Sequence, residues 1–239
     1  MILPVGKPTI RISKLDADGN KAPWKTIDIP VDGSTTMDTE AGEKTEYLEE
    51  GGGVVDSYQK QSKYTLTFTL YAKKGVQKPI EDSNGVIVGN YAISLTPEDP
   101  ECHGFIMHKC SVSCRETYSA AHGVRWEYTF SGLVSTETTE ILDEYIAAQH
   151  FDLSANYLSF AAAEDTTGQT VTADLGAGTT ITAAAGTTDM WITTAVSNLT
   201  VTVTVAANAT TSKRIGYVTV TAGTKTAKLK VIQAAGTAS

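Results

Sequence analysis

The sequence has no long apolar run and little cysteine. No stretch approaches the length needed to span a bilayer, so we expect no membrane partner. Three cysteines, an odd number, indicate reduced thiols and not a disulfide framework. The first residues, MILPVGKPTIRI, lack the regions of a secretory signal. Unless a signal has been removed, we expect the protein to be made in the cytoplasm and to stay there at first.

Positive charge is also scarce, because 19 basic residues stand against 27 acidic ones, a net charge of −8. After residue 151, five basic residues balance five acidic ones, so the entire acidic excess belongs to the first 151 residues. This distribution argues against a basic surface that grips phosphates. We therefore expect no sequence-specific nucleic-acid partner.

Motifs for catalysis are missing as well. The sequence contains no Gly-x-Ser-x-Gly elbow, no cysteine with a persuasive histidine partner, and no glycine-rich phosphate loop after a strand. Paired carboxylates occur only in an acidic, glycine-ended segment, where desolvation cannot tune their pKa values. We expect no enzyme, no catalytic residue and no cofactor.

One group of metal-ligating residue types lies between positions 102 and 122. Its members are Cys102, His103, His108, Cys110, Cys114 and His122. Zinc sites close with two ligand pairs, each two to four residues apart, and these spacings are irregular. A structural zinc is the alternative, but free cysteine is among the most buried residue types. We therefore predict buried thiols and no metal.

What the sequence does contain is strict alternation, most clearly over Trp191–Gln233. Valines, a leucine and other apolar residues alternate with threonines and lysines around positions 200–205, 217–221 and 227–231. A period of two with β-branched residues on one face predicts half-buried antiparallel strands. Polar, glycine-containing turns separate the runs. The stretch predicts a small all-β sandwich.

The same stretch resembles the BACON family (Bacteroidetes-associated carbohydrate-binding often N-terminal). Trp191, the Asn of TVTVAAN, Arg214 and the Gln that closes LKVIQAA follow one another in the family's order, within Leu153–Ala235. The resemblance implies an immunoglobulin-like domain over residues 151–239, with glycans as possible partners. Trp191 is then either a sugar-stacking platform or, as we favour, a core residue of the sandwich.

Two N-glycosylation sequons lie in this domain, at Asn198 and Asn208. In a chain without a secretory signal, we expect both to be turn residues.

The first 150 residues also contain alternating runs. In the best of them, Tyr64, Leu66, Phe68 and Leu70 face one way and threonines the other. Burial of four such side chains is enough to nucleate a sheet. Strands are predicted at Thr9–Leu15, Trp24–Ile29, Val54–Tyr71, Val86–Leu95, Phe105–Cys114 and Val124–Leu133, the first two around a turn at Asp16–Asn20.

Between these runs, Thr35–Gly53 has a different composition. It is rich in acid and ends in three glycines; the acidic residues are Asp38, Glu40, Glu43, Glu46, Glu49 and Glu50. Such a segment buries too little apolar surface to order itself, which predicts a long flexible loop. A loop of this length is either functional or simply a solvated surface segment.

The period changes near residue 141. Ile141, Leu142, Tyr145, Ile146 and Ala148 fall on one face of a short helix, with Thr138 or Thr139 as its cap. The predicted fold is therefore mainly β: an N-terminal antiparallel β-sandwich or barrel with one short helix (residues 1–150), followed by the immunoglobulin-like sandwich.

The layout of residues 1–150 resembles that of phage major tail tube proteins and related virion proteins. The resemblance rests on GEKTEYLEEGGGVVDSYQ feeding KYTLTFTLY, with RWEYTFSGL late. It implies homo-oligomeric rings or tubes, other tail proteins as partners, location in the virion, and an outward C-terminal domain. Glu43, Glu46, Glu49 and Glu50 would then form an acidic assembly or lumen loop that repels DNA over roughly 8 Å.

Two functions follow. The first is a structural subunit of a phage or prophage tail. The alternative is a surface protein that binds carbohydrate or mucin through its C-terminal domain. A glycan-binding surface protein should begin with a secretory signal, so the missing signal favours the first.

Overall fold

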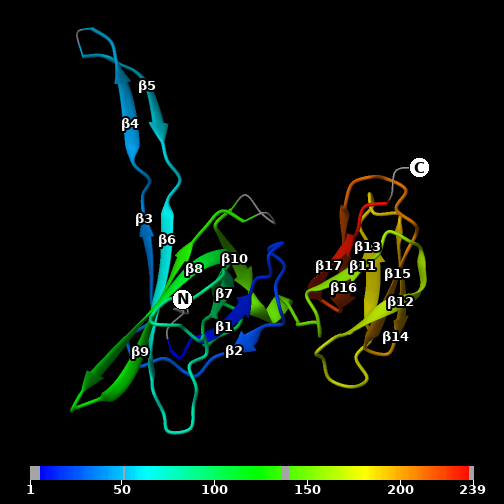
Figure 1. The fold of residues 1–239 in the computed structure, drawn as a ribbon, viewed down its shortest axis with the longest axis horizontal. Coiled ribbons are helices and arrows are strands. Elements are labelled where there is room, and N and C mark those ends of the chain that lie inside the picture. The colour runs from blue at the N-terminus through cyan, green and yellow to red at the C-terminus, as the bar shows by residue number, and fades with distance from the viewer. Residues whose placement is uncertain (1–5, 51, 136–139, 237–239) are drawn as a thin grey trace.

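The computed structural model describes residues 6–50, 52–135 and 140–236, and almost all of its regular structure is β (Figure 1). This confirms the predicted mainly β fold class. The elements are β1 (Thr9–Lys14), β2 (Lys25–Thr26), β3 (Thr36–Glu40), β4 (Lys44–Leu48), β5 (Val54–Gln59), β6 (Lys63–Tyr71), β7 (Tyr91–Thr96), β8 (His103–Ser119), β9 (Gly123–Gly132), β10 (Leu142–Ile146), the 3-10 helix η1 (Ala147–Gln149), β11 (Tyr157–Phe160), β12 (Asp165–Thr172), β13 (Thr182–Ala185), β14 (Ile192–Ser197), β15 (Thr200–Val205), β16 (Arg214–Ala222) and β17 (Lys225–Gln233).

The N-terminal strands form one antiparallel sheet in the order β2-β1-β7-β8-β9-β6-β3, with β10 paired to β8. Phe68 stacks on Tyr128 and Phe130 at ring-centroid distances of 5.6 and 5.8 Å. One core joins β1 and β7 to β6 and β9, so the sheet curves around it. The buried residues of this core are Ile10, Ile12, Ile27, Leu66, Phe68, Leu70, Ile80, Tyr91, Ile93, Met107, Cys110, Trp126, Tyr128 and Phe130.

The helix predicted over 141–148 is wrong. This segment forms β10 and then η1, and β10 pairs with β8 in antiparallel register. Tertiary pairing overrides the helical periodicity, because β8 offers a free edge and the Tyr145 hydroxyl bonds to Thr96 of β7. The two candidate caps, Thr138 and Thr139, lie outside the described residues.

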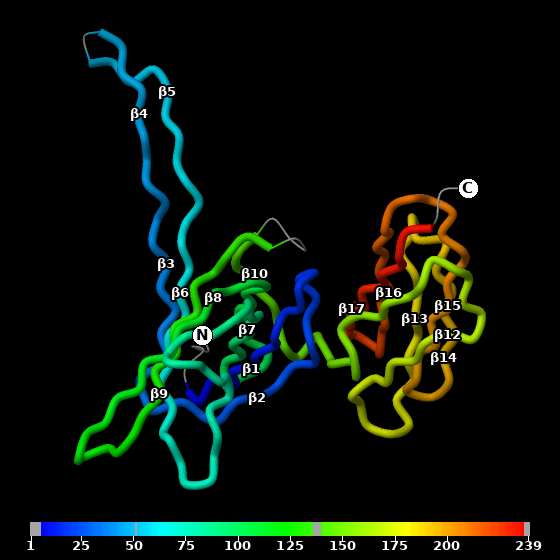
Figure 2. The backbone as a smooth tube through the Cα atoms, viewed as in Figure 1, coloured from blue at the N-terminus to red at the C-terminus, as the bar shows by residue number. Residues whose placement is uncertain are grey.

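The flexible loop predicted over Thr35–Gly53 is also wrong. The segment forms β3, which pairs with β6, and β4, which within the described ranges pairs with β5 alone (Figure 2). Acidic residues stand opposite lysines across this hairpin, with Glu40 3.3 Å from Lys63 and Glu43 2.6 Å from Lys60. The loop was predicted from the acidic composition of the segment, which treats these carboxylates as unpaired charges. Their lysine partners lie across the hairpin, so the two strands were missed. We call β4 and β5 together the arm.

The C-terminal strands form two facing sheets, β11-β17-β16-β13 and β12-β15-β14. Between them lies a second core, rich in valine, whose members include Val201, Val203, Val218 and Leu229. The strands predicted around 200–205, 217–221 and 227–231 are confirmed as β15, β16 and β17. The two cores share no residue, and Leu153 is the first member of the second. No helix within the described ranges is long and apolar enough to cross a membrane.

Candidate functional site

The arm extends away from the curved sheet and is continuous with it through β3 and β6 (Figure 1). Every residue of β4 and β5 is exposed. The exposed residues include large apolar ones, with Leu48 62% and Tyr58 60% exposed, together with Tyr47, Val54 and Val55. Isolated two-stranded hairpins are marginally stable in water. The arm therefore leaves large apolar side chains uncovered by the rest of the described chain.

The register places the apolar side chains of the arm in two groups. Leu48 pairs with Val54, so these two share one face. Tyr58 pairs with Thr45, two residues before Tyr47, which puts the two tyrosines diagonally on the other face. The arm thus offers apolar contacts on both of its faces.

The four glutamates proposed as an assembly loop lie on and beside the arm. Glu43 pairs with Lys60 at 2.6 Å, and Glu46 pairs with Lys44 at 2.7 Å. Glu49 makes the end of the hairpin, since its N–H donates to the Gly53 carbonyl at 2.9 Å. Glu50 is exposed beside it. These residues lie on or beside a paired two-stranded hairpin, and so they do not form the irregular loop that was predicted.

Exposed apolar residues also lie at the end of the molecule opposite the arm. The β8–β9 hairpin and the segment between β6 and β7 both point away from the arm (Figure 2). Tyr118, near the tip of the first, is 77% exposed. Val86 and Val88, in the second, are exposed as well. The two ends of the N-terminal sheet therefore carry different apolar surfaces.

The cysteines and histidines of positions 102–122 do not converge. No group that could hold a metal ion occurs in the part of the chain that the structure describes. Cys110 is fully buried in the core, and this burial raises the pKa of its thiol to about 12. Cys114 and Cys102 are only half-buried. The expectation of buried thiols is thus confirmed for Cys110 alone.

The residues that carry the BACON resemblance meet at one end of the C-terminal sandwich. The Arg214 guanidinium lies 4.3 Å from the centre of the Trp191 ring, and its Nε donates to Gln233 Oε1 at 2.8 Å. Gln233 is fully buried and donates to the carbonyls of Ala162, Ala163 and Ala206. Burial lowers the pKa of Arg214. These residues hold the sandwich together.

Trp191 itself is half-buried and packs against the valine core, with Arg214 over its ring. A ring covered in this way is a poor platform for a sugar. The core role and the glycan role of Trp191 both stay predictions, and the geometry favours the former.

Asn208 is a structural residue. It is 3% exposed, and its Nδ2 donates to the carbonyls of Ser212 and Ala234 at 2.9 and 2.8 Å. Its Oδ1 accepts from Thr210, the third residue of the sequon. A buried amide with these partners is not open to glycosylation.

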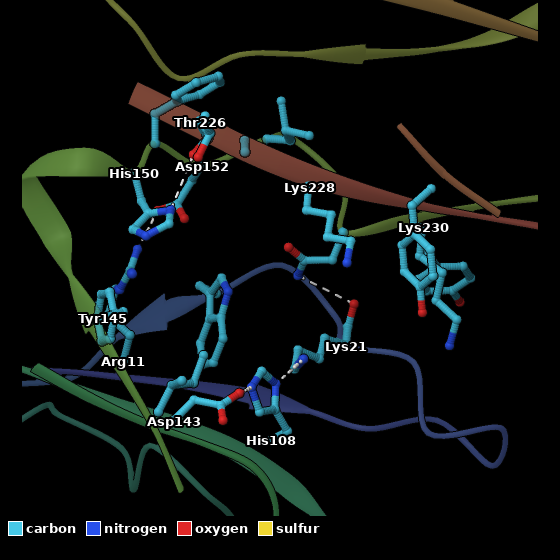
Figure 3. A pocket seen from close by; sticks show the side chains of 18 of the residues that line it. Arg11, Lys21, His108, Asp143, Tyr145, His150, Asp152, Thr226, Lys228 and Lys230 are labelled. Carbon is cyan, nitrogen blue, oxygen red and sulfur yellow. Dashed lines mark hydrogen bonds and ion pairs between the residues drawn. The ribbon is translucent and has the colours of Figure 1, made fainter. Parts of the chain in front are cut away.

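A cleft of about 520 Å³ separates the N-terminal sheet from the outer face of β16 and β17 (Figure 3). β10 and the segment between β1 and β2 form one wall. Lys228 and Lys230, which alternate with core residues on β17, extend from the other wall. Its residues are Arg11, Asn20, Lys21, Trp24, Ile106, His108, Asp143, Glu144, Tyr145, His150, Phe151, Asp152, Leu153, Asn156, Tyr157, Tyr217, Thr226, Ala227, Lys228 and Lys230.

On the N-terminal wall, His108 links a lysine to an aspartate. Lys21 Nζ lies 2.8 Å from His108 Nδ1, and His108 Nε2 lies 2.6 Å from Asp143 Oδ2. The ammonium can only donate, so Nδ1 accepts and Nε2–H donates to the carboxylate. Both ring nitrogens have partners, which leaves His108 unsuited to act as a general base.

Hydrogen bonds across the junction fix the cleft's two walls. Lys230, which is buried, donates to Asn20 Oδ1 at 2.7 Å, and Asn156 Nδ2 donates to the Ala22 carbonyl at 2.6 Å. Arg11 pairs with Asp152. The junction is thus made of specific polar contacts between the two halves of the chain.

Asp16 also takes part in this junction. Burial raises the pKa of its carboxyl, but hydrogen bonds from Asn20, Tyr157 and the Asp18 backbone outweigh this effect and lower the pKa below 3.8. Burial, and then the nearby Asp16 carboxylate, raise the pKa of Tyr157. The Asp16 carboxyl therefore stays ionised to a lower pH than a free aspartate.

Sequence reasoning missed this cleft. Asp143 faces His108 only because β10 pairs with β8, and the segment had been predicted as a helix. Lys228 and Lys230, two positions apart on β17, were the available signal, since a buried lysine such as Lys230 needs a polar partner.

Comparison with known proteins gives a family match for the C-terminal sandwich. No curated protein matches the chain. Residues 153–234 match the family BACON, whose description reads "Putative binding domain, N-terminal". The matched range contains neither the arm nor the N-terminal sheet, whose resemblance to tail tube proteins stays a prediction. The C-terminal sandwich is a BACON-like domain.

Proposed function

We propose that this chain is a non-enzymatic structural subunit that assembles with copies of itself, of the kind that builds a phage or prophage tail tube. In this proposal the N-terminal sheet forms the ring or tube together with other tail proteins of the virion. The BACON-like domain is an accessory domain on the outside. The proposal involves no cofactor and no membrane.

The observation that carries the proposal is the exposed arm. Its strands leave large apolar side chains in solvent on both faces, and monomeric proteins rarely expose such contiguous surface. Its outer strand edges also present unpaired backbone groups, which template pairing with another chain. A partner that covers the arm removes both costs.

The position of the arm favours head-to-tail contact between copies. The arm lies at one end of the N-terminal sheet, and the β8–β9 hairpin and the segment between β6 and β7 lie at the other (Figure 1). These two segments carry the exposed Tyr118, Val86 and Val88. A contact between two different surfaces of the same chain is heterologous, and it generates rings or open filaments. A tube needs contacts of this type.

Replacement of residues 44–59 by an Asn-Gly turn tests the proposal. In this variant the Asn-Gly turn closes the shortened hairpin a few residues beyond the ends of β3 and β6, so the pairing of these two strands is retained. We expect the full chain to form rings or tubes in negative-stain micrographs at rising concentration, and the variant to stay a single copy. A full chain that is a single copy at every concentration would contradict the proposal, as would assembly without the arm.

The acidic side chains of the arm have a secondary role in the proposal. Glu43 and Glu46 have lysine partners, whereas Glu49 and Glu50 stand at its tip. We propose that these two repel phosphate where they line the lumen. Assembly of the Glu49→Gln/Glu50→Gln double variant should be unchanged, and retention of DNA by its tubes should rise.

A second candidate function is carbohydrate or mucin binding through the C-terminal domain, favoured by the match to a binding-domain family. A glycan array probed with the full chain and with Trp191→Phe tests it. Binding that Trp191→Phe weakens would support Trp191 as a contact, and no binding to any glycan would count against this function.

A further inference from the structure

Another hollow of the N-terminal sheet lies between β1, with the residues that follow it, and the segment that joins β6 to β7. Its volume is about 530 Å³, and we call it the groove. Ile12, Ile80 and Tyr91 line it and are buried, whereas Val86 and Val88 line it and are 61% and 76% exposed. The groove is therefore an apolar hollow with an exposed rim, and its outer wall points away from the arm (Figure 2).

The outer wall of the groove is fixed to the sheet. Ser83 and Val86 pair across a tight turn of this wall. Lys78 Nζ lies 2.7 Å from Asp82 Oδ1 and 3.1 Å from Glu116 of β8, which ties the wall to that strand. These contacts hold the wall in place in a single copy, and a preformed site costs less free energy of ordering on binding.

The groove carries positive charge in a chain of net charge −8. Lys14 and Lys25 line it, and neither has a carboxylate within ion-pair distance among the described residues. Two carboxylates line it as well, of which Asp82 is paired with Lys78. Glu81 is the other, so two lysines face one carboxylate that lacks a lysine partner within the described ranges. This balance suits an acidic partner.

One face of the arm complements this surface. The register of β4 and β5 puts Tyr47, Asp56 and Tyr58 on that face, all exposed. In the part of the chain that the structure describes, no lysine or arginine lies within ion-pair distance of Asp56. On the opposite face, Lys44 and Glu46 pair with each other at 2.7 Å. The tyrosine face thus combines two aromatic rings with an acidic group that has no cation partner.

We propose that the tyrosine face of the arm docks in the groove of a second copy, with its rings against Val86 and Val88 and with Asp56 beside Lys14 and Lys25. This inference rests on the proposed self-assembly and names the two surfaces that meet. Tyrosine is enriched at the centre of protein interfaces, where its ring fills an apolar pocket. Each copy carries both an arm and a groove, so the same contact can repeat from copy to copy.

The β8–β9 hairpin, which carries Tyr118, is the alternative acceptor. It protrudes from the sheet as a two-stranded ribbon (Figure 1). A protruding ribbon meets another ribbon along one side and cannot enclose the rings of the arm. The groove has walls on two sides, which favours it as the acceptor.

Sedimentation velocity at rising concentration tests the proposal with variants of the groove in the full chain. Val88→Asp places a charge at the rim, and the double variant Lys14→Glu/Lys25→Glu reverses the charge of the groove. We expect each variant to need at least about tenfold more protein than the unaltered chain to assemble. Val76→Asp and Lys74→Glu are the matched controls, because both residues are exposed on the same segment outside the groove, and their assembly should be unchanged.

A reversal of charge on both sides tests the pairing itself. Asp56→Lys should weaken assembly of an otherwise unaltered chain by at least about tenfold, because it places a cation beside the two lysines. Combination of Asp56→Lys with Lys14→Glu/Lys25→Glu should restore assembly, since the attraction is rebuilt with the signs exchanged. Two unrelated defects would add instead of cancelling.

A mixture of two variants tests the head-to-tail contact. The arm-less variant keeps its groove, and Val88→Asp keeps its arm. Each should stay a single copy by itself at concentrations where the full chain assembles. Mixed together, they should form pairs and no larger particle, because only one arm and one groove remain to meet.

The results separate this inference from the proposed function. Assembly of the groove variants at the concentration that the full chain needs would overturn the inference, and so would a mixture without pairs. The proposed function would still stand if the arm-less variant stays a single copy. A full chain that never assembles would contradict both. Circular dichroism of each variant shows whether it is folded.

Discussion

The arm and the strands of the C-terminal sandwich are made from similar residues and have opposite surroundings. In β15, Val201, Val203 and Val205 alternate with threonines and are buried. In β5, Val54 and Val55 are exposed. The difference lies in the number of neighbouring strands. β15 stands between β12 and β14 and faces a second sheet, whereas among the described strands β5 pairs with β4 alone. Alternation of apolar and polar residues thus predicts a strand, but it does not predict whether the apolar face is buried within the same chain.

The contrast has an energetic consequence. A fully buried valine or leucine side chain contributes about 1.5–3 kcal/mol relative to an exposed one. The apolar side chains of the sandwich are buried within one copy, so they stabilise the single chain. The arm does not, so its apolar residues can contribute only in contact with another molecule.

The largest effect should come from the sandwich core. Leu229→Ala removes a fully buried side chain between the two sheets, and we expect a loss of about 3–4 kcal/mol in unfolding free energy. Urea unfolding followed by circular dichroism measures it. A loss below about 1 kcal/mol would mean that the two sheets are not packed as described.

A somewhat smaller loss should follow from Trp191→Ala. The ring packs on the core and carries Arg214 over one face, but it is half exposed, so we expect about 3 kcal/mol, the low end for a tryptophan. The same urea titration applies. A melt that hardly moves would place the ring on the surface and would restore the sugar platform as an interpretation.

The junction should depend on pH through Asp16. Its pKa is lowered in the folded chain, so its stabilising effect is present above the ordinary value of 3.8 and is lost as pH falls through the lowered value. We expect Asp16→Ala to lower the melting temperature at neutral pH and to make progressively less difference as the pH falls below about 4. An equal difference at both ends of this range would show that the carboxylate charge is not involved.

The smallest effect on a single copy should come from the arm. Leu48→Ser with Tyr58→Ser removes two exposed apolar side chains, so we expect a change in unfolding free energy within about 0.5 kcal/mol. Assembly, followed by sedimentation velocity, should nevertheless be lost. Thr45→Ser is the matched control on the same hairpin, and it should leave assembly intact.

Much of the fold could be predicted from the local sequence pattern. In strands such as β6 and β15, apolar residues alternate with polar ones, and this alternation shows which face of the strand is buried. The errors arose where partners lie far along the chain. Glu43 and Lys60 balance each other across a hairpin, yet 17 residues separate them. A short stretch of sequence that includes the glutamates but not their lysine partners is read as an excess of negative charge, and this reading predicts disorder.

The segment around Tyr145 failed for the same reason. Its apolar residues fit a helical face, but the free edge of β8 and the hydroxyl of Thr96 decide its conformation. The two lysines of β17 were the one local signal for the cleft, but its position could not be predicted, because its walls join segments around residues 20, 108, 143 and 228. Only the resemblance to BACON pointed toward binding, and it indicated Trp191.

Hydrogen–deuterium exchange of residues 44–59, compared between dilute and concentrated protein, tests the central claim most directly. The account predicts that backbone amides of the arm exchange fast in the single copy and at least about tenfold more slowly at concentrations where particles form, while β15 to β17 stay unchanged. Equal exchange of the arm under both conditions would contradict the claim that another copy covers it.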